Sequence, residues 1–181
     1  MVNKLNNQRA LETKRIITES FLSLLKSRPI SQITVTAIAK KACINRSTFY
    51  QHYLDVYDLL EKISHNFIVD LTQTIYLNST NDDLKNGLVK MLNVIQSHKI
   101  IASICLANLQ NDKKISHYFE DIRKTTFQIF RSVNSNLSDF DCELKYTFFA
   151  QGSISVILKW LNEPNDLSVD RIAQLLVSLY I

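Results

Sequence analysis

Residues 34–53 read TVTAIAKKACINRSTFYQHY and carry several side chains that suit hydrogen bonding to nucleic acid. The guanidinium of Arg46 can form two parallel hydrogen bonds with the edge of a guanine. The side-chain amide of Gln51 can do the same with adenine, or bond a phosphate. Tyr50 can touch a thymine methyl or a phosphate. These groups indicate DNA reading rather than bond-making or bond-breaking chemistry.

Such contacts need a helix that enters the major groove, and the same segment predicts one. Ile38 and Ala42 lie four residues apart, on one face of a predicted helix over 35–42. Phe49 is the apolar plug of a second predicted helix over 46–53, and the polar side chains fall on its other side. Two short helices joined by a tight turn form a helix-turn-helix. The spacing alone would also fit two amphipathic surface helices of another all-α domain.

The charge distribution favours the DNA-reading interpretation. Residues 1–54 contain nine Lys or Arg and two acidic residues, which gives a net charge of +7. The rest of the sequence contains twelve basic and fifteen acidic residues, a net charge of −3. A basic segment that coincides with the motif attracts phosphates and releases their counterions. A general solubility bias explains this asymmetry less well.

The segment from Lys14 to Leu60 resembles the tetracycline-repressor (TetR) family of bacterial transcriptional regulators. The matching pieces are KRIITESFLSLL, ITVTAIAKKACI and NRSTFYQHY followed by DLL. The resemblance implies a homodimer that binds a palindromic operator on double-stranded DNA, most commonly as a repressor. The later piece GSISVILKWLNEP is similar to one subgroup, which includes the activator of a dihydroxyacetone-kinase operon.

The motif and the resemblance together define the candidate DNA contacts. Thr48 and His52 match phosphate-contacting positions of the family, and Thr36 matches a position that reaches DNA from the preceding helix. Lys40 and Lys41 fit a solvated face at least as well. The candidate contacts are Thr36, Asn45, Arg46, Ser47, Thr48, Tyr50, Gln51 and His52.

Two positions depart from the family pattern. Cys43 stands at the turn, where the family usually has Gly, so the turn is either strained by about 1 kcal/mol or differently shaped. Val56 stands where the family usually has a Lys that touches a phosphate. The amides at the start of the helix after Asp55 could still face a phosphate. These departures are the only support for the alternative function, a protein-interaction module or co-activator that kept the fold and lost specific DNA binding.

The whole chain predicts an all-α fold of about nine helices. Gly and Pro occur twice each in 181 residues, so few turns and long helices are expected. We expect a DNA-binding domain over 1–54 and an effector-binding and dimerisation domain over 55–181. Helix-capping residues are predicted at Thr34, Asp55, Ser138 and Ser168. The predicted helices cover about 8–27, 35–42, 46–53, 56–78, 83–96, 99–109, 111–133, 139–162 and 169 to the C-terminus.

The last two predicted helices carry enough apolar residues for a dimer interface, although the same residues could fill the core of a monomer. Gly152 would allow a close approach of a partner backbone. The candidate interface residues are Gly152, Ile157, Trp160, Leu161, Leu176, Leu179 and Tyr180.

The family usually binds a small-molecule effector between the fourth and eighth helices. A residue of each candidate type is found more often at an ordinary core or surface position than in contact with a ligand, because ligand pockets use few polar groups. The candidates are His65, His98, Cys105, Tyr118, Phe148, Gln151 and Ser155.

Other classes of function lack support in the sequence. It contains no His pair with the spacing of a helical zinc site, no Gly-rich phosphate loop and no GxSxG segment. We therefore predict no catalysis, no cofactor and no metal. Three widely spaced cysteines fit a reducing cytoplasm. The start MVNKLNNQRALE lacks the apolar core of a signal peptide, and IIASICLA is too short to span a bilayer.

Overall fold

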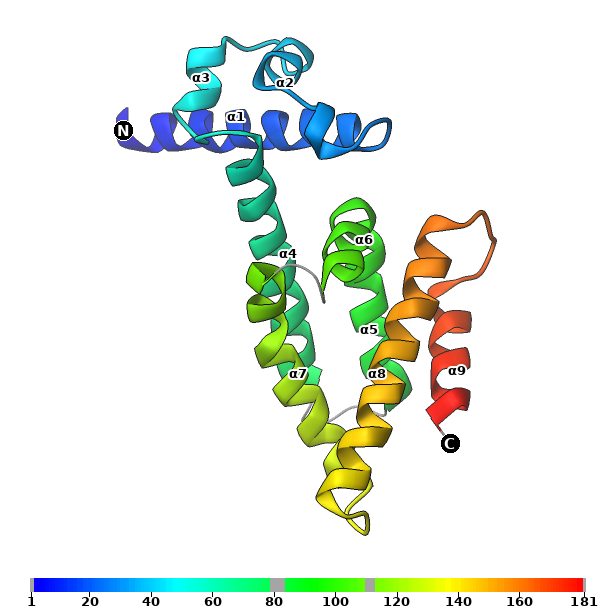
Figure 1. Ribbon diagram of the computed structural model, residues 1–181. Helices are drawn as coiled ribbons and strands as arrows, with labels where there is room; N and C mark the ends of the chain where they lie inside the picture. The colour runs from blue at the N-terminus through cyan, green and yellow to red at the C-terminus, as the bar shows by residue number, and fades with distance from the viewer. Residues whose placement is uncertain (1, 79–83, 110–112, 181) are drawn as a thin grey trace. The chain divides into compact units, whose positions relative to one another are not determined.

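The computed structural model describes residues 2–78, 84–109 and 113–180, and every regular element in these ranges is helical (Figure 1). The predicted all-α fold is confirmed. A 3₁₀ turn, η1 (Ile30–Gln32), follows the first helix. The helices are α1 (Val2–Leu25), α2 (Val35–Lys41), α3 (Arg46–Tyr50), α4 (Val56–Asn78), α5 (Leu84–Ser97), α6 (Lys99–Asn108), α7 (Lys113–Val133), α8 (Asp139–Asn162) and α9 (Val169–Tyr180).

All four predicted caps form hydrogen bonds. The Thr34 hydroxyl accepts from the amide of Ala37 at 3.2 Å. The remaining caps act in the same way, each accepting from an amide two or three residues later. They are Asp55 with Tyr57 and Asp58, Ser138 with Asp141, and Ser168 with Arg171. These local bonds explain why the starts of α2, α4, α8 and α9 were predictable.

Two helices differ from the predicted bounds by three residues or more, and the start predicted at residue 111 lies outside the described residues. α1 begins at Val2 rather than near residue 8. Arg15 forms ion pairs with Glu12 and Glu19, one turn away on either side, and such pairs stabilise an exposed helix. α3 ends at Tyr50, because the amide of His52 bonds to the Phe49 carbonyl only three residues back and tightens the last turn.

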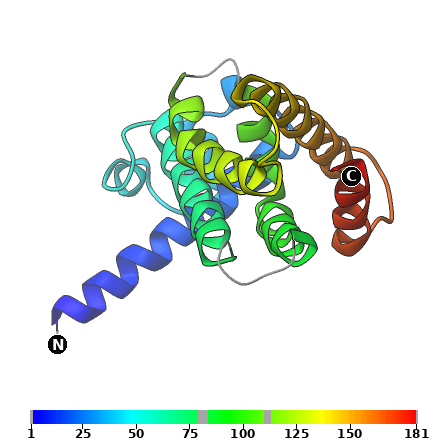
Figure 2. The same ribbon diagram turned by 90° about the horizontal axis from the view of Figure 1, so that it is seen from below.

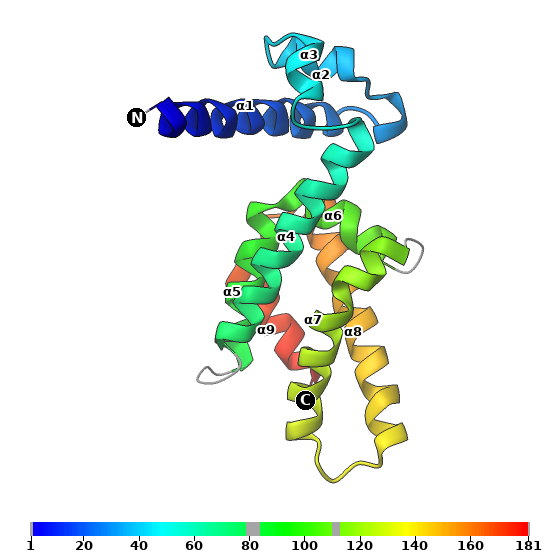
Figure 3. The ribbon, with the colours of Figure 1, turned by 90° about the vertical axis from the view of Figure 1, so that its left-hand side faces the viewer.

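The chain divides into two compact units, residues 1–64 and 65–181. In the first unit, α2 and α3 lie on the same side of α1 (Figures 1 and 3). Their apolar faces meet in one core, which includes Val56 and Leu59 from the start of α4. This unit is therefore longer than residues 1–54, because the first turns of α4 complete its core. α4 continues from the first unit into the second.

The second unit is built from the rest of α4 and from α5 to α9. α5 packs against α9, and α6 packs against α8. α7 and α8 form an antiparallel pair joined by residues 134–138 (Figure 3), and α9 lies beside α8 (Figure 2). The largest fully buried side chains in this unit are Phe67, Leu92, Ile95, Ile101, Leu161, Ile172 and Leu176. Within the described ranges, no helix has the length and apolarity needed to cross a membrane.

Candidate nucleic-acid interface

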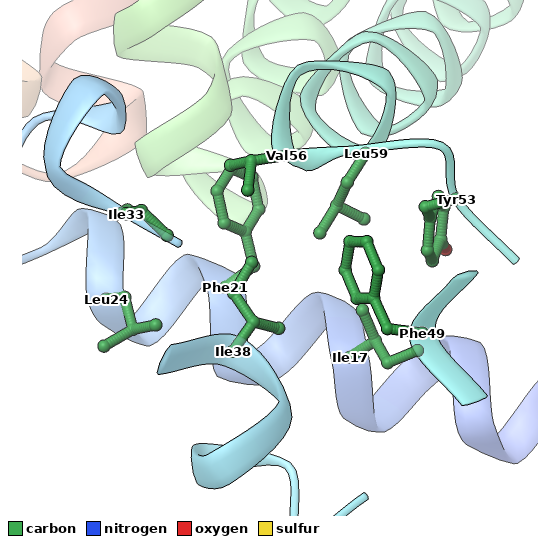
Figure 4. Close-up of a cluster of buried hydrophobic side chains, with 9 residues drawn as sticks. All are labelled: Ile17, Phe21, Leu24, Ile33, Ile38, Phe49, Tyr53, Val56 and Leu59. Carbon is green, nitrogen blue, oxygen red and sulfur yellow. The ribbon is translucent and has the colours of Figure 1, made fainter. Parts of the chain in front are cut away.

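The α3 helix is anchored by one aromatic side chain. Phe49 is completely buried and lies between Ile17 of α1 and Leu59 of α4 (Figure 4). Tyr53 is buried beside it, with ring centroids 5.6 Å apart. A helix of five residues has little stability of its own, so this plug fixes which face is buried and which is presented to solvent.

The opposite face of α3 is polar and exposed. Arg46 and Tyr50 lie one turn apart, with the guanidinium carbon 6.0 Å from the ring centroid. The Tyr50 ring also packs edge-on against the Phe49 ring, with ring centroids 5.7 Å apart. The phenol is thus held against the core while about half of it stays exposed. The exposed candidate contacts are Thr36, Asn45, Arg46, Ser47, Tyr50 and Gln51, and the half-buried ones are Thr48 and His52.

His52 sits where burial and positive charge act together. Burial lowers the pKa of its imidazole below the usual value, and the nearby ammonium of Lys14 on α1 lowers it further. Both effects disfavour the imidazolium. A phosphate beside His52 and Lys14 would oppose them, because an anion favours the charged ring.

The turn between α2 and α3 is left-handed at Cys43, with φ 55°. The Ile44 amide bonds to the Ala39 carbonyl at 3.0 Å, and the Cys43 amide bonds to the Lys40 carbonyl at 3.4 Å. These two bonds form a Schellman motif, which usually carries Gly at the left-handed position. The turn therefore has the usual shape, and Cys43 bears the strain of about 1 kcal/mol that its side chain imposes there.

The first amides of α4 are hydrogen-bonded to a side chain of the protein itself. Val56 is buried in the core of the first unit. The amides of Tyr57 and Asp58 both donate to the Asp55 carboxylate at 2.8 Å. These two amides are thus already hydrogen-bonded, and the carboxylates of Asp55 and Asp58 flank the buried Val56.

Sequence reasoning missed a contact that joins α4 to the end of α3. Lys62 forms an ion pair with Asp58 and also donates to the His52 carbonyl. The four-residue spacing of Asp58 and Lys62 was the available signal. The strong exposure of two apolar side chains, Leu54 before α4 and Tyr57 in its first turn, was also missed.

The candidate effector residues do not converge on one cavity. His65 lines a surface depression of about 310 Å³ between α4 and α7. Phe148 lines a second depression of about 390 Å³. Neither depression is lined by the other candidates whose side chains are described, His98, Cys105, Gln151 and Ser155. The Tyr118 side chain lies outside the described residues.

Those other candidates have distinct surroundings. His98 is half-buried between α5 and α6, with its Nε2 atom 3.7 Å from the Asp70 carboxylate. Cys105 is completely buried in α6. Gln151 and Ser155 are exposed one turn apart on α8.

The candidate dimer residues fall into two groups. Ile157, Trp160, Leu161 and Leu176 are buried within a single chain, and the Trp160 indole donates to the Leu167 carbonyl at 3.0 Å. Gly152 and Leu179 are exposed, and Tyr180 has a side chain outside the described residues. Of the predicted set with described side chains, only the exposed members could therefore be reached by a second copy.

An apolar stripe runs along the exposed side of α8. Phe140, Leu144 and Phe148 recur every four residues and are 72%, 54% and 81% exposed. Gly152 continues the spacing, and a methyl group added there would meet nothing within 4 Å. Leu179 of α9 shares the second depression with Leu144 and Phe148.

Within the described ranges, no cluster of three His, Cys, Asp or Glu side chains is arranged to hold a metal ion.

Comparisons of this chain with known proteins agree on one family. Residues 82–181, more than half of the chain, match the TetR-type family described as "Transcriptional regulator C-terminal region". The uncharacterized HTH-type transcriptional regulator YxbF of Bacillus subtilis (strain 168) is 24% identical over 164 residues, covering 87% of this chain and 42% of that protein. The HTH-type dhaKLM operon transcriptional activator DhaS of Lactococcus lactis subsp. lactis (strain IL1403) is 30% identical over 115 residues, covering 64% of this chain and 58% of that protein.

The chain thus spans about half the length of these two curated relatives. Solved structures share its fold. The dihydroxyacetone kinase operon activator DhaS has a TM-score of 0.61 at 21% identity, covering 93% of both chains. The TetR family transcriptional regulator PfmR of Thermus thermophilus has a TM-score of 0.73 at 14% identity, covering 91% of this chain and 96% of the other. The chain therefore belongs to the TetR family, whose members are transcriptional regulators and not enzymes.

Proposed function

We propose that this protein is a transcriptional repressor that binds a palindromic operator as a homodimer, with α3 in the major groove. The observation that carries the proposal is the two-sidedness of α3, which is plugged by Phe49 and presents Arg46, Tyr50 and Gln51 to solvent. We assign DNA reading to residues 1–54, and effector binding and dimerisation to residues 55–181. Such a regulator works beside the chromosome, in the bacterial cytoplasm.

The α3 side chains divide into base contacts and phosphate contacts. Arg46 heads the helix, and its stacking on Tyr50 preorders the guanidinium for bidentate bonding to guanine. Gln51 is exposed one position beyond Tyr50 and suits adenine. Thr48 and His52 are half-buried, and His52 lies near Lys14 of α1, as expected of a group that fixes register on phosphates.

The second copy is proposed to cover the α8 stripe. A row of exposed aromatic and aliphatic side chains is unusual on a monomer and marks an interaction surface. A two-fold axis would place the same stripe of both copies face to face, which suits a self-complementary patch. Gly152, whose surroundings are open, would admit the partner's backbone where the two α8 helices cross.

A small-molecule effector is proposed to act on the second unit by shifting the population of DNA-binding conformations. Repression is the simplest outcome of operator occupancy, because a bound dimer excludes other proteins from the promoter. The opposite outcome is represented among the relatives, since DhaS is named a transcriptional activator. A reporter fused to the bound promoter distinguishes the two, since loss of a repressor raises transcription and loss of an activator lowers it.

The decisive experiment measures binding to DNA upstream of the protein's own gene and of its neighbours across a salt series. Wild type should protect a palindrome and bind more weakly as salt rises. Arg46→Ala should lose about tenfold to a hundredfold in affinity for that site and little for unrelated DNA. Arg28→Ala is the matched control, because it removes the same charge from an exposed position outside α3. Equal, weak binding of wild type to every fragment would overturn the proposal in favour of a protein-interaction module.

A further inference from the structure

Three groups of the first unit meet at the ammonium of Lys62. It lies 2.9 Å from a carboxylate oxygen of Asp58, 3.4 Å from the carbonyl oxygen of His52 and 5.2 Å from the ring centroid of Tyr53. The same Asp58 oxygen accepts from the Leu54 amide at 2.9 Å. One ion pair on α4 therefore holds the backbone that leaves α3 at two points, His52 and Leu54.

The environment of this pair favours the charged forms. The side chain of Asp58 is only 20% exposed, while that of Lys62 is 53% exposed. Burial raises the pKa of the Asp58 carboxyl, but hydrogen bonds from Lys62 and from the Leu54 amide outweigh it and leave the pKa below its usual value. The carboxylate is thus ionised at neutral pH, and its two hydrogen bonds fix its orientation.

An ordinary ion pair along an exposed helix contributes little to stability, because solvent screens both charges. The pair between Lys159 of α8 and Glu163, the residue that follows this helix, is of that kind, with 2.9 Å between the charged atoms and both side chains well exposed. The Lys62–Asp58 pair differs because both partners also bond to the segment between α3 and α4. Its effect is therefore on the position of that segment rather than on the helix that carries it.

We propose that Lys62 is a positioning residue for DNA reading, which holds the C-terminal end of α3 against α4 through the His52 carbonyl and the Tyr53 ring without itself contacting DNA. This inference rests on the proposed DNA-reading function of α3. Phe49 fixes the depth of the short helix and the face that it buries. A second tie, at the helix end, supplies the angular precision that base contacts need.

Charge removal from the two partners distinguishes positioning from direct contact with a phosphate. If Lys62 only positions α3, Lys62→Met and Asp58→Asn should each lower operator affinity about three- to fivefold, and the double variant should be no worse than either. The slope of log affinity against log salt should stay unchanged. If Lys62 instead touched a phosphate, Lys62→Met would lower that slope by about one, and Asp58→Asn would raise affinity.

The experiment measures affinity for the operator and for unrelated DNA, with Lys159→Met as the matched control and Lys62→Arg as the conservative variant. Positioning predicts that Lys62→Met reduces the ratio of the two affinities and that Lys62→Arg retains it. An unchanged ratio with lowered thermal stability would overturn the inference and leave a purely structural role. Wild type that selects no DNA would remove the proposed function, and this inference with it. A Lys62→Met variant that selects the operator as well as wild type does would remove this inference alone.

Discussion

The two units of the chain use the same kind of side chain in opposite ways. In the first unit, Phe49 is completely buried and leaves a polar face outside. In the second unit, Phe148 is 81% exposed and is not part of the buried core. The first unit therefore uses its aromatic plug to build its own core and leaves the polar face of α3 free for recognition. The second unit retains an apolar surface whose burial we assign to another copy.

The largest effect that tests this comparison is loss of the α3 plug. Phe49→Ala should lower the free energy of unfolding of the first unit by about 3–5 kcal/mol, because it leaves a cavity among packed side chains. Trp160, the only tryptophan, is buried in the second unit and reports on that unit. Urea unfolding should show an early loss of helix by circular dichroism and an unchanged transition by Trp160 fluorescence.

Leu11→Ala, at an exposed apolar position of α1, is the control for this change and should alter stability by no more than about 0.5 kcal/mol. One coincident transition for both probes in Phe49→Ala would show that the two units unfold together. The comparison between them would then fail as a statement about stability.

Charge placed on the α8 stripe tests the other half of the comparison. Phe148→Glu should give monomers in sedimentation equilibrium, because a buried, unpaired carboxylate opposes association. Affinity for a full palindrome should fall about a hundredfold, since the two heads no longer bind as a linked pair. Thr147→Glu is the control, because it adds the same charge at the preceding, exposed position; this variant should stay dimeric. A dimeric Phe148→Glu protein would place the interface elsewhere.

A smaller effect is expected at the turn between α2 and α3. Cys43→Gly should raise the free energy of unfolding of the first unit by about 1 kcal/mol, because Gly adopts the left-handed conformation without a side-chain clash. Cys43→Ala retains the side-chain carbon and should give no such gain. Denaturant midpoints of the two variants against wild type measure the difference. Equal midpoints for both would show that the turn carries no strain.

The smallest expected effect is a pH dependence of the first unit. The folded-state pKa of His52 lies below its unfolded value near 6.5. The unfolded chain therefore binds more protons in that range, and stability is full above pH 6.5 and is lost as the pH falls. His52→Gln should flatten this dependence when urea unfolding by circular dichroism is compared at about pH 5.5 and about pH 7.5. An unchanged slope would assign the dependence to other groups.

The parts of the fold that follow from short-range bonding were predictable. Thr34, Asp55, Ser138 and Ser168 cap helices through amides two or three residues away, so the sequence itself contains both partners. The two helices of the helix-turn-helix followed from the four-residue spacing of Ile38 and Ala42 and from the single apolar plug at Phe49. The early start of α1 was missed, because a polar sequence gives no apolar pattern from which to read a helix.

The placement of the second unit's side chains was less predictable. An apolar α8 is readable from its composition, but which of its faces meets α6 and α9 depends on packing between distant elements. Trp160 and Leu161 therefore lie in the chain's own core, while Phe140 and Leu144 are exposed. Polar residues such as His98 and Gln151 lie on different elements for the same reason, and no local pattern brings candidate pocket residues together.

The three cysteines differ sharply in access to solvent: Cys43 is exposed, whereas Cys105 and Cys142 are buried. The native protein thus carries one thiol that a maleimide dye can reach while the fold is intact. That thiol stands at the turn next to Asn45 and Arg46, so a dye there would sense its surroundings as α3 engages a ligand. Unmodified wild-type chain therefore offers a site-specific fluorescent reporter of recognition, without removal of any other cysteine.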